Sequence, residues 1–260
     1  MNDALKGRRV LVTRPAHQAE KLAAPLRALG AEVLLLPMLE VLPPSDPAPL
    51  RHSVRNLGTF RWIVFSSANA VRAVAVELLA QDSRLQDYPD SRVAAVGEET
   101  AHALADLGRE ADFVPDIATA ASLAATLAPL VGGQHLLLPQ QPGASPSLAL
   151  ALETAGAKVQ RVDAYRTALP VESAAGLKAL YADNTKVPDV LTFASAQSAR
   201  NFYELVRDAG IPLPPNTVIA SIGPATSEAL KVIGAEPQVQ AVRPTAESLA
   251  KAIASYFASR

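Results

Sequence analysis

The second half of this 260-residue chain repeats the first half. The pentapeptide FSSAN at positions 65–69 returns as FASAQ at 193–197, an offset of 128 (193 − 65). Three further motifs, GAEV at 30–33, VGEET at 96–100 and TAASL at 119–123, return in the same order as GAKV, IGPAT and TAESL at an offset of 126 (156 − 30). Four motifs in one order at nearly one offset predict two copies of one fold. Proteins built from two such units commonly bind small molecules in the space between them.

Short apolar runs alternate with longer amphipathic segments along both halves. The run at 10–12 is too short for a helix, and the segment after it places Leu22, Leu26 and Leu29 on one helical face before Gly30 ends it. Continuous apolar runs of this kind are typical of parallel strands covered on both faces. We therefore expect strands at 10–12, 33–36, 62–65, 93–96, 136–138, 159–162, 190–193 and 218–222, and further helices that end at Gly108, Gly156, Gly210 and Gly234. Right-handed crossovers would wind each half into an open parallel sheet, an α/β fold.

The residues alone leave two positions open for the domain boundary. A proline-rich segment at 43–49 follows the second expected strand and is incompatible with a central strand or a helix interior. In one division the chain leaves the first lobe here and returns near the matching segment at 165–170. In the simpler division, two consecutive domains meet near Gly132-Gly133, where the repeat starts again.

Composition excludes several classes of partner and chemistry. With 24 basic and 25 acidic residues the formal net charge is −1, so we expect neither nucleic acid nor an anionic membrane as a partner. The absence of cysteine excludes disulfides, thiolate metal sites and cysteine nucleophiles, and the four histidines lack ligand spacing, so we expect no metal. No strand is followed by a Walker or GxGxxG turn. Apolar runs are too short for a signal core or a membrane span, and we expect a cytoplasmic protein.

Five motifs together give the chain a family resemblance. They are VLVTRP at 10–15, FSSANAV at 65–71, VGEETA at 96–101, DAYRT at 163–167 and IGPAT at 222–226. Each is a strand followed by a small polar turn, but the ordered set spans essentially the whole chain and resembles uroporphyrinogen-III synthase. The resemblance implies two similar open parallel-sheet lobes, flavodoxin-like or Rossmann-like, joined by a two-stranded connector, with the active site in the cleft between them.

The resemblance also favours the first of the two domain divisions. It implies a discontinuous lobe one, residues 1–38 with 168–260, and a lobe two of residues 39–167, with crossings near 39–42 and 163–167. The implied reaction belongs to haem biosynthesis and uses no cofactor: hydroxymethylbilane, a linear tetrapyrrole, loses water and inverts its last pyrrole ring to give uroporphyrinogen III. We expect a monomer that makes a transient contact with the preceding enzyme of the pathway.

The implied substrate is a polyanion, because its pyrrole rings carry acetate and propionate groups. Helix N-termini bind anions through free N–H groups and the positive end of the helix dipole, and ligands of open parallel sheets lie outside the carboxyl ends of the strands. The small polar turns of the motifs follow strands at this edge, so the expected substrate-binding residues are Thr13, Arg14, Ser66, Ser67, Asn69, Gly97, Thr100, Ser195, Ser198, Gly223 and Thr226. The alternative is that the Ser, Thr and Asn side chains only cap their own helices and that the arginine makes only local contacts.

Tyr165 is the candidate catalytic residue. Loss of the hydroxyl group from a hydroxymethylpyrrole is assisted by a positioned proton donor, and a phenol can supply or relay that proton. In the family, the tyrosine of the motif that reads YRT at 165–167 here is the favoured candidate. The alternative is a tyrosine that packs the two lobes together.

Two functions of different class remain open, because one fold can serve both. The first is the synthase, and the second is a non-catalytic two-lobed sensor or binding protein for a small anionic ligand. The segment PQQPGAS at 139–145 departs from the family pattern, since many relatives carry an arginine and a glycine-rich turn there. The full set of motifs and Tyr165 favour the enzyme.

Overall fold

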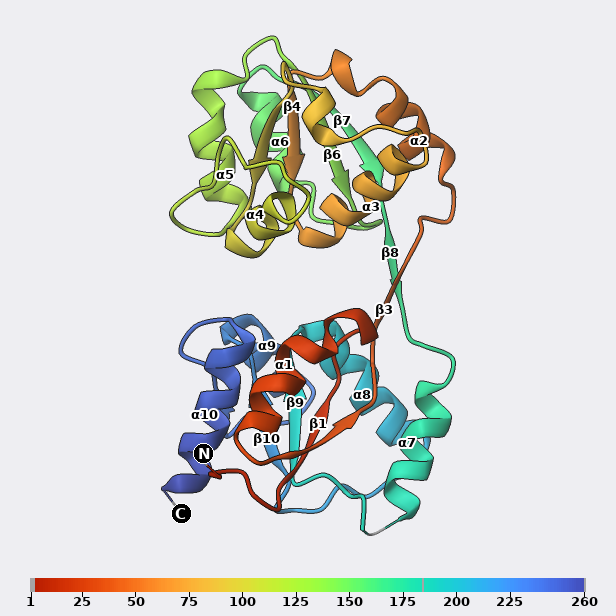
Figure 1. Cartoon of the computed structure of the whole chain (residues 1–260), viewed down its shortest axis with the longest axis vertical. Helices are drawn as coiled ribbons and strands as arrows, with labels where there is room; N and C mark the ends of the chain where they lie inside the picture. Colours follow the sequence, from red (N-terminus) through yellow and green to blue (C-terminus); the bar gives the residue numbers. More distant parts are fainter. Residues whose placement is uncertain (1–2, 184, 260) are drawn as a thin grey trace. The chain divides into compact units, whose positions relative to one another are not determined.

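Two compact units make up the chain, whose computed structural model describes residues 3–183 and 185–259. Unit 1 takes the chain up to Glu40 and from Ala168 onward, and unit 2 takes Val41–Thr167. The chain passes from one unit to the other at β3 (Glu40–Leu42) and β8 (Arg166–Ala168), which pair as a two-stranded sheet (Figure 1). The expected α/β fold, two units on parallel sheets, is confirmed.

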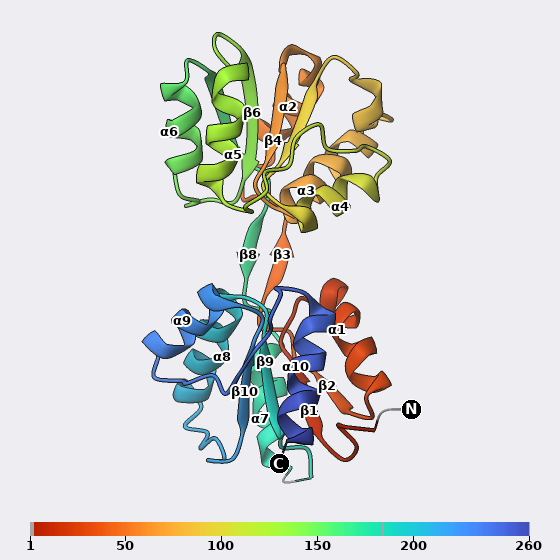
Figure 2. The same ribbon diagram turned by 90° about the vertical axis from the view of Figure 1, so that its left-hand side faces the viewer.

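Unit 1 is built on a five-stranded parallel sheet (Figure 2). The strand order is β11 (Val239–Gln240), β10 (Val218–Ser221), β9 (Val190–Phe193), β1 (Arg9–Val12) and β2 (Glu32–Leu35). Helices α1 (Ala16–Ala28) and α10 (Ala246–Ala258) pack on one face through one core cluster. Helices α7 (Ser173–Ala182), α8 (Ala196–Asp208) and α9 (Pro224–Val232) pack on the other face.

Unit 2 repeats this arrangement with four parallel strands. Their order is β5 (Arg92–Ala95), β4 (Trp62–Phe65), β6 (His135–Gln140) and β7 (Lys158–Asp163). Helices α2 (Ala48–Arg55), α3 (Ala68–Leu79) and α4 (Glu98–Ala105) pack on one face, and α5 (Ala120–Leu127) and α6 (Ser147–Thr154) on the other. Three short 3₁₀ helices complete the unit: η1 (Leu57–Thr59), η2 (Leu85–Asp87) and η3 (Ala128–Leu130).

The two sequence repeats are interleaved between the units. The offsets of 126 and 128 pair β4 with β9, β5 with β10, β6 with β1 and β7 with β2, so β5-β4-β6-β7 in unit 2 corresponds to β10-β9-β1-β2 in unit 1. Each sheet therefore takes two of these strands from each repeat. Gly132-Gly133, where the repeat starts again, lies inside unit 2 between η3 and β6.

Successive residues of the central strands enter opposite faces of the sheet. In β4, Trp62 and Val64 belong to one core cluster of unit 2, whereas Ile63 and Phe65 belong to the other. All four are buried, as expected for a parallel strand covered by helices on both faces. The eight expected strands are present as β1, β2, β4, β5, β6, β7, β9 and β10. β11 was not predicted, because its two residues give no periodic signal.

Two tyrosines of unit 1 have buried hydroxyls that pair with no group in residues 3–183 or 185–259. They are Tyr181 on α7 and Tyr203 on α8. Burial raises the pKa of Tyr203 to about 12, and burial together with the neighbouring Tyr203 raises the pKa of Tyr181 still further. Both side chains therefore stay neutral in the folded chain at a pH where an exposed phenol, with a pKa of about 10, loses its proton.

We expect the free energy of unfolding to fall as the pH rises from about 10 toward 12. In this window the unfolded chain releases phenol protons that the native chain retains, so the unfolded state binds fewer protons and becomes favoured. The double variant Tyr181→Phe, Tyr203→Phe has no such protons to lose. Urea unfolding at pH 8 and pH 11 should show a smaller alkaline loss for this variant than for the wild type, and equal losses would contradict the assignment.

Candidate functional site

In unit 2 the candidate catalytic tyrosine lies at the carboxyl edge of the sheet. Tyr165 follows β7, whose pairing with β6 continues to the backbone bond from Ala164 N–H to the carbonyl of Gln140 (2.7 Å). The ring of Tyr165 is part of a core cluster and only 7% of the residue is exposed. Its hydroxyl lies 3.0 Å from Oγ of Ser67, which follows β4. The phenol is therefore buried and hydrogen-bonded beside the start of α3.

Ser67 is the N-cap of α3 and has two hydrogen-bond partners. Its Oγ accepts a bond from the backbone N–H of Ala70 (3.2 Å) in addition to its bond with Tyr165. Ser66 is half-buried beside it, and Asn69 accepts a bond through Oδ1 from Nη1 of Arg72 (3.2 Å). The structure therefore brings Tyr165, Ser66, Ser67 and Asn69 together around one helix start.

Gly97 and Thr100 form the next turn of unit 2, where β5 leads into α4. Gly97 is the N-cap and contributes no side chain to the first turn, and the N–H of Thr100 donates to the Gly97 carbonyl (3.1 Å). The turn places the positive end of the α4 dipole at the carboxyl edge of the sheet, but the side chains of Glu98 and Glu99 lie in that turn and weaken its attraction for anions.

A close contact explains why position 97 carries glycine. A Cβ built on Gly97 would lie 2.8 Å from Cβ of Ala118, whereas one built on Gly223, the equivalent residue in unit 1, would lie 3.8 Å from Cβ of Pro244. Both glycines have extended backbone that alanine can also adopt. The difference between the two positions is therefore one of space rather than of conformation.

Gly97→Ala is expected to destabilise the chain by about 1–3 kcal/mol, because the 118 segment has to move to admit the methyl group. Gly223→Ala makes the same chemical change at a helix N-cap but meets only an ordinary van der Waals contact, so only the cost of alanine at an N-cap, about 0.5–1 kcal/mol, should remain. Thermal unfolding of the two variants measures the difference. Equal shifts in Tm would show that the contact with Ala118 is not the cause.

In unit 1 the corresponding turns lie at the carboxyl ends of β1, β9 and β10. Thr13 is fully buried, and its hydroxyl donates to the carbonyl of Thr192 across the sheet (2.7 Å), so this group is used inside the unit. Arg14, which follows it, is 9% exposed. Ser195 caps α8 by accepting a bond from the N–H of Ser198 (3.1 Å), and its own hydroxyl donates to Oγ of Ser198 (2.9 Å).

Gly223 and Thr226 form the turn between β10 and α9. Gly223 is the N-cap without a side-chain contact, Pro224 follows it, and Thr226 is 5% exposed. No acidic residue lies in the first turn of α9. Of the two helices that start at a glycine, α9 therefore offers an anion the more favourable electrostatic environment.

Sequence reasoning missed a buried hydroxyl network beside this turn. Oγ of Ser227 donates to Oε1 of Gln240 (2.6 Å), and Oγ of Ser221 lies 2.6 Å from Oγ of Ser227. Because the single proton of Ser227 goes to Gln240, Ser221 is the donor in the second bond. The sequence could not reveal this network, because Gln240 lies on β11, the strand that was not predicted.

Gln140 was also missed, although the sequence placed it in a turn that departs from the family pattern. It is the last residue of β6 and is 6% exposed. With its amide oxygen turned toward Arg161, Gln140 accepts bonds from Nη2 (2.8 Å) and Nε (3.1 Å) of that arginine. This pair brings a guanidinium group from β7 to the carboxyl edge of unit 2.

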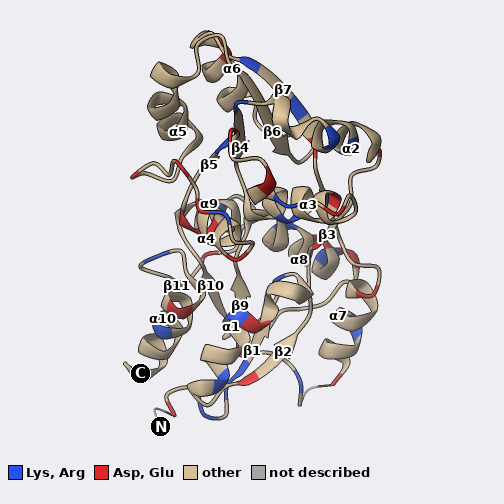
Figure 3. Cartoon of the chain, turned by 45° about the horizontal axis from the view of Figure 1, so that its top comes forward, with Lys and Arg blue, Asp and Glu red and all other residues tan. Residues whose placement is uncertain are grey.

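Lys and Arg residues are interspersed with Asp and Glu residues over both units. Figure 3 shows basic and acidic segments interspersed along the chain. Within residues 3–183 and 185–259, no three His, Asp or Glu side chains group closely enough to hold a metal ion. The same residues include no helix that is long and apolar enough to cross a membrane. Anion binding at the turns would depend on backbone N–H groups, hydroxyls and single arginines.

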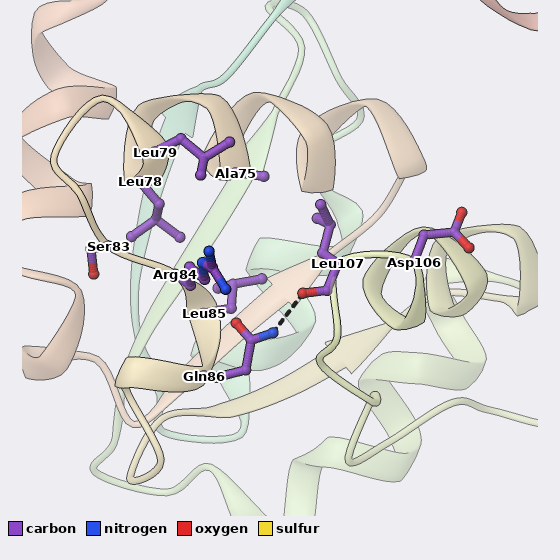
Figure 4. A pocket seen from close by; sticks show the side chains of 9 residues that line it. All are labelled: Ala75, Leu78, Leu79, Ser83, Arg84, Leu85, Gln86, Asp106 and Leu107. Atoms are coloured by element: carbon purple, nitrogen blue, oxygen red, sulfur yellow. Dashed lines mark hydrogen bonds between the residues drawn. The ribbon is translucent and has the colours of Figure 1, made fainter.

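A hollow of about 200 Å³ in unit 2 lies away from these turns (Figure 4). Its walls come from the C-terminal ends of α3 and α4 and from η2, where Gln86 Nε2 donates to the carbonyl of Leu107 (2.6 Å). Helices that start at the carboxyl edge of a parallel sheet end at its amino edge. This hollow is therefore at the opposite edge from Tyr165 and is not part of the candidate site.

Comparison with known proteins gives one consistent result. The family model described as uroporphyrinogen-III synthase HemD matches residues 20–251. The chain is 36% identical over 254 residues to a uroporphyrinogen-III synthase of Synechococcus elongatus, covering 96% of this chain and 95% of that one. It is 29% identical to the Chlorobaculum parvum enzyme of the same name, covering 94% and 97%.

Solved structures support the fold. A mutant uroporphyrinogen III synthase of Thermus thermophilus superposes with a TM-score of 0.65 at 20% identity, covering 98% of this chain and all of that chain (100%). The uroporphyrinogen-III synthetase of Helicobacter pylori superposes with a TM-score of 0.61 at 20% identity, covering 96% and 99%.

Proposed function

The chain belongs to the uroporphyrinogen-III synthase family, and we propose that it converts hydroxymethylbilane into uroporphyrinogen III with loss of water and inversion of the last ring. The observation that carries the proposal is the identity of 36% to a synthase over 96% of the chain. Tyr165 and the turns of both units supply groups that suit this reaction. The relatives bear the names of synthases, so the alternative of a non-catalytic sensor is not favoured.

The carboxylates of the substrate are proposed to bind at the carboxyl edges of both units. Gly223 and Thr226 would offer the N-terminus of α9, and Gly97 and Thr100 that of α4. Arg14 would supply a charged contact. Ser66, Asn69 and the serines Ser195 and Ser198 would add polar contacts at the starts of α3 and α8. Thr13 would act indirectly, since its hydroxyl bond to Thr192 fixes the strand end that carries the arginine.

Tyr165 is proposed to donate the proton that allows the hydroxyl group to leave. The bond between the hydroxymethyl carbon and its oxygen breaks, both electrons leave with the oxygen, and the oxygen takes the phenol proton and departs as water. The cation that remains is stabilised by its pyrrole ring. After ring closure the last ring loses the proton of its free α-carbon, and this proton restores the phenol, so the step needs no cofactor.

Selectivity is proposed to come from holding the substrate in one geometry. In water the free α-position of the last ring attacks the cation directly and gives the symmetric isomer I. Isomer III requires attack from the substituted position, a spiro intermediate and inversion of the ring. Many backbone and hydroxyl contacts can fix a flexible chain in the required fold, and such contacts are what the turns of both units offer.

Three finer proposals concern the protein in the cell. A polyanionic substrate does not cross membranes unaided, so the chain is proposed to work in the cytoplasm together with the enzyme that makes this substrate. A transient contact with that enzyme would limit spontaneous closure to isomer I.

The chain is proposed to be a monomer, since each unit buries both faces of its own sheet. Sedimentation analysis would test this proposal.

The activity is tested by supplying freshly generated hydroxymethylbilane to the purified protein and separating isomers I and III after oxidation. We expect isomer III in excess over a buffer control and over the heat-unfolded protein. A product composition equal to that of the buffer would refute the proposed function.

A further inference from the structure

One pair of equivalent serines, Ser67 and Ser195, makes different hydrogen bonds in the two copies of the fold. Ser67 in unit 2 and Ser195 in unit 1 are equivalent at the offset of 128, and both cap a helix by accepting a backbone N–H bond. The second bond of each serine is different. Ser195 donates to Oγ of Ser198, whereas Ser67 pairs with the hydroxyl of Tyr165.

Two substitutions between the copies produce this difference. The counterpart of Ser198 is Ala70, which has no hydroxyl and leaves the proton of Ser67 available. The counterpart of Tyr165, at the offset of 126, is Leu39, which has no polar group. Both units therefore have the serine helix cap, but only unit 2 has a hydrogen-bonded pair of serine and tyrosine.

Either hydroxyl can be the donor in this pair, and the cap is compatible with Ser67 as the donor. Oγ of Ser67 accepts a bond from the Ala70 N–H in the first turn of α3, and its own O–H is then free to donate. If the phenol oxygen of Tyr165 accepts that proton, the phenol O–H is free for a substrate. In that arrangement the chain of bonds from the Ala70 N–H to Ser67 and on to Tyr165 polarises each member in the same direction.

From these contacts we infer that Ser67 is a positioning residue that orients the Tyr165 phenol as the proton donor of the reaction. Ser67 keeps its own proton throughout. Before the reaction its O–H holds the phenol oxygen, and after the phenol proton has gone to the departing water, the same O–H stabilises the phenolate until a proton returns. This inference rests on the proposed function, and it assigns Ser67 a role that acts through Tyr165 rather than through substrate contact.

A double-mutant cycle tests the inference. Ser67→Ala should lower kcat about fivefold, the effect of one hydrogen bond, with KM within about twofold of the wild type. In the Tyr165→Phe background the same substitution should cause no further loss in kcat, because the group that Ser67 orients is absent. Ser67→Thr keeps a hydroxyl and a cap and should restore most of the activity.

Two further variants separate positioning from helix capping. Thr119 caps α5 of the same unit by accepting a bond from the N–H of Ser122 (3.1 Å), so Thr119→Ala removes a similar cap without touching Tyr165. It should lower stability but leave kcat unchanged. Ala70→Ser keeps Ser67, its cap and Tyr165, but introduces the competing acceptor that unit 1 carries at Ser198. It should lower kcat in the same direction as Ser67→Ala.

Several results would overturn the inference while leaving the proposed function intact. They are formation of isomer III by the wild type together with equal kcat for Ser67→Ala and Thr119→Ala, an undiminished kcat in Ala70→Ser, or a loss from Ser67→Ala that persists in the Tyr165→Phe background. Failure of the wild type to form isomer III would instead refute the proposed function itself.

Discussion

Phe193→Ala is expected to lower the free energy of unfolding of unit 1 by about 3–5 kcal/mol. Phe193 is fully buried at the end of β9. Its ring packs against Phe202 with centroids 5.5 Å apart in a T-shaped arrangement, and against Tyr203 at 6.0 Å. Truncation removes both aromatic contacts and leaves a cavity that the surrounding sheet and α8 cannot fill by small shifts.

The loss of stability in Phe193→Ala should be confined to unit 1, because each core cluster draws its buried residues from one unit only. The single tryptophan, Trp62, is buried in unit 2 and reports on that unit by fluorescence, whereas circular dichroism follows both units. In urea, Phe193→Ala should move part of the dichroism transition to lower concentration and leave the fluorescence transition unchanged.

The matched control is Val232→Ala on α9 of the same unit. Val232 is 86% exposed, so its truncation should change stability by no more than about 0.5 kcal/mol. A parallel shift of both signals in Phe193→Ala would show that the two units unfold as one, contrary to the division of the cores.

Tyr165→Phe is expected to lower kcat about tenfold to a hundredfold, at or below the low end of what a general acid contributes. The loss stays at the low end because a hydroxymethylpyrrole ionises readily and its ring stabilises the cation. The phenylalanine ring can occupy the same place in the core cluster, so KM and stability should change little. Only the hydroxyl and its bond to Ser67 are removed.

Steady-state rates and product isomers, measured together, check this prediction. If selectivity comes from holding the substrate folded, the slower variant should still form isomer III at the protein. Wild-type kcat in Tyr165→Phe would exclude a proton-donating role for the phenol. A switch of the bound product to isomer I would show that Tyr165 steers ring closure rather than assisting departure of the hydroxyl.

The positions of most strands and helix ends could be predicted from the sequence, because apolar periodicity and helix-ending residues are local properties. The runs at 62–65 and 190–193 became β4 and β9, and glycines such as Gly30 and Gly156 end helices with φ of 90° and 89°, in the left-handed region. The crossings at β3 and β8 were inferred from family resemblance, because their three residues each carry too little pattern.

The partners of each hydroxyl could not be predicted in the same way. Ser67 meets a tyrosine 98 positions away, and Thr13 meets a carbonyl 179 positions away. Both serve their own unit, Ser67 as a helix cap and Thr13 within the sheet. Sequence identifies which polar residues follow a strand, but the choice between capping, internal bonding and ligand contact depends on neighbours that only the fold brings close.

The isomer composition of the product at increasing protein concentration tests the central claim most directly. Hydroxymethylbilane closes by itself to isomer I, so every molecule of isomer III above the buffer level reports on the protein. We predict that the fraction of isomer III rises with protein concentration from the buffer value toward completeness. A fraction that stays at the buffer value at every concentration would contradict the assignment of this chain as a uroporphyrinogen-III synthase.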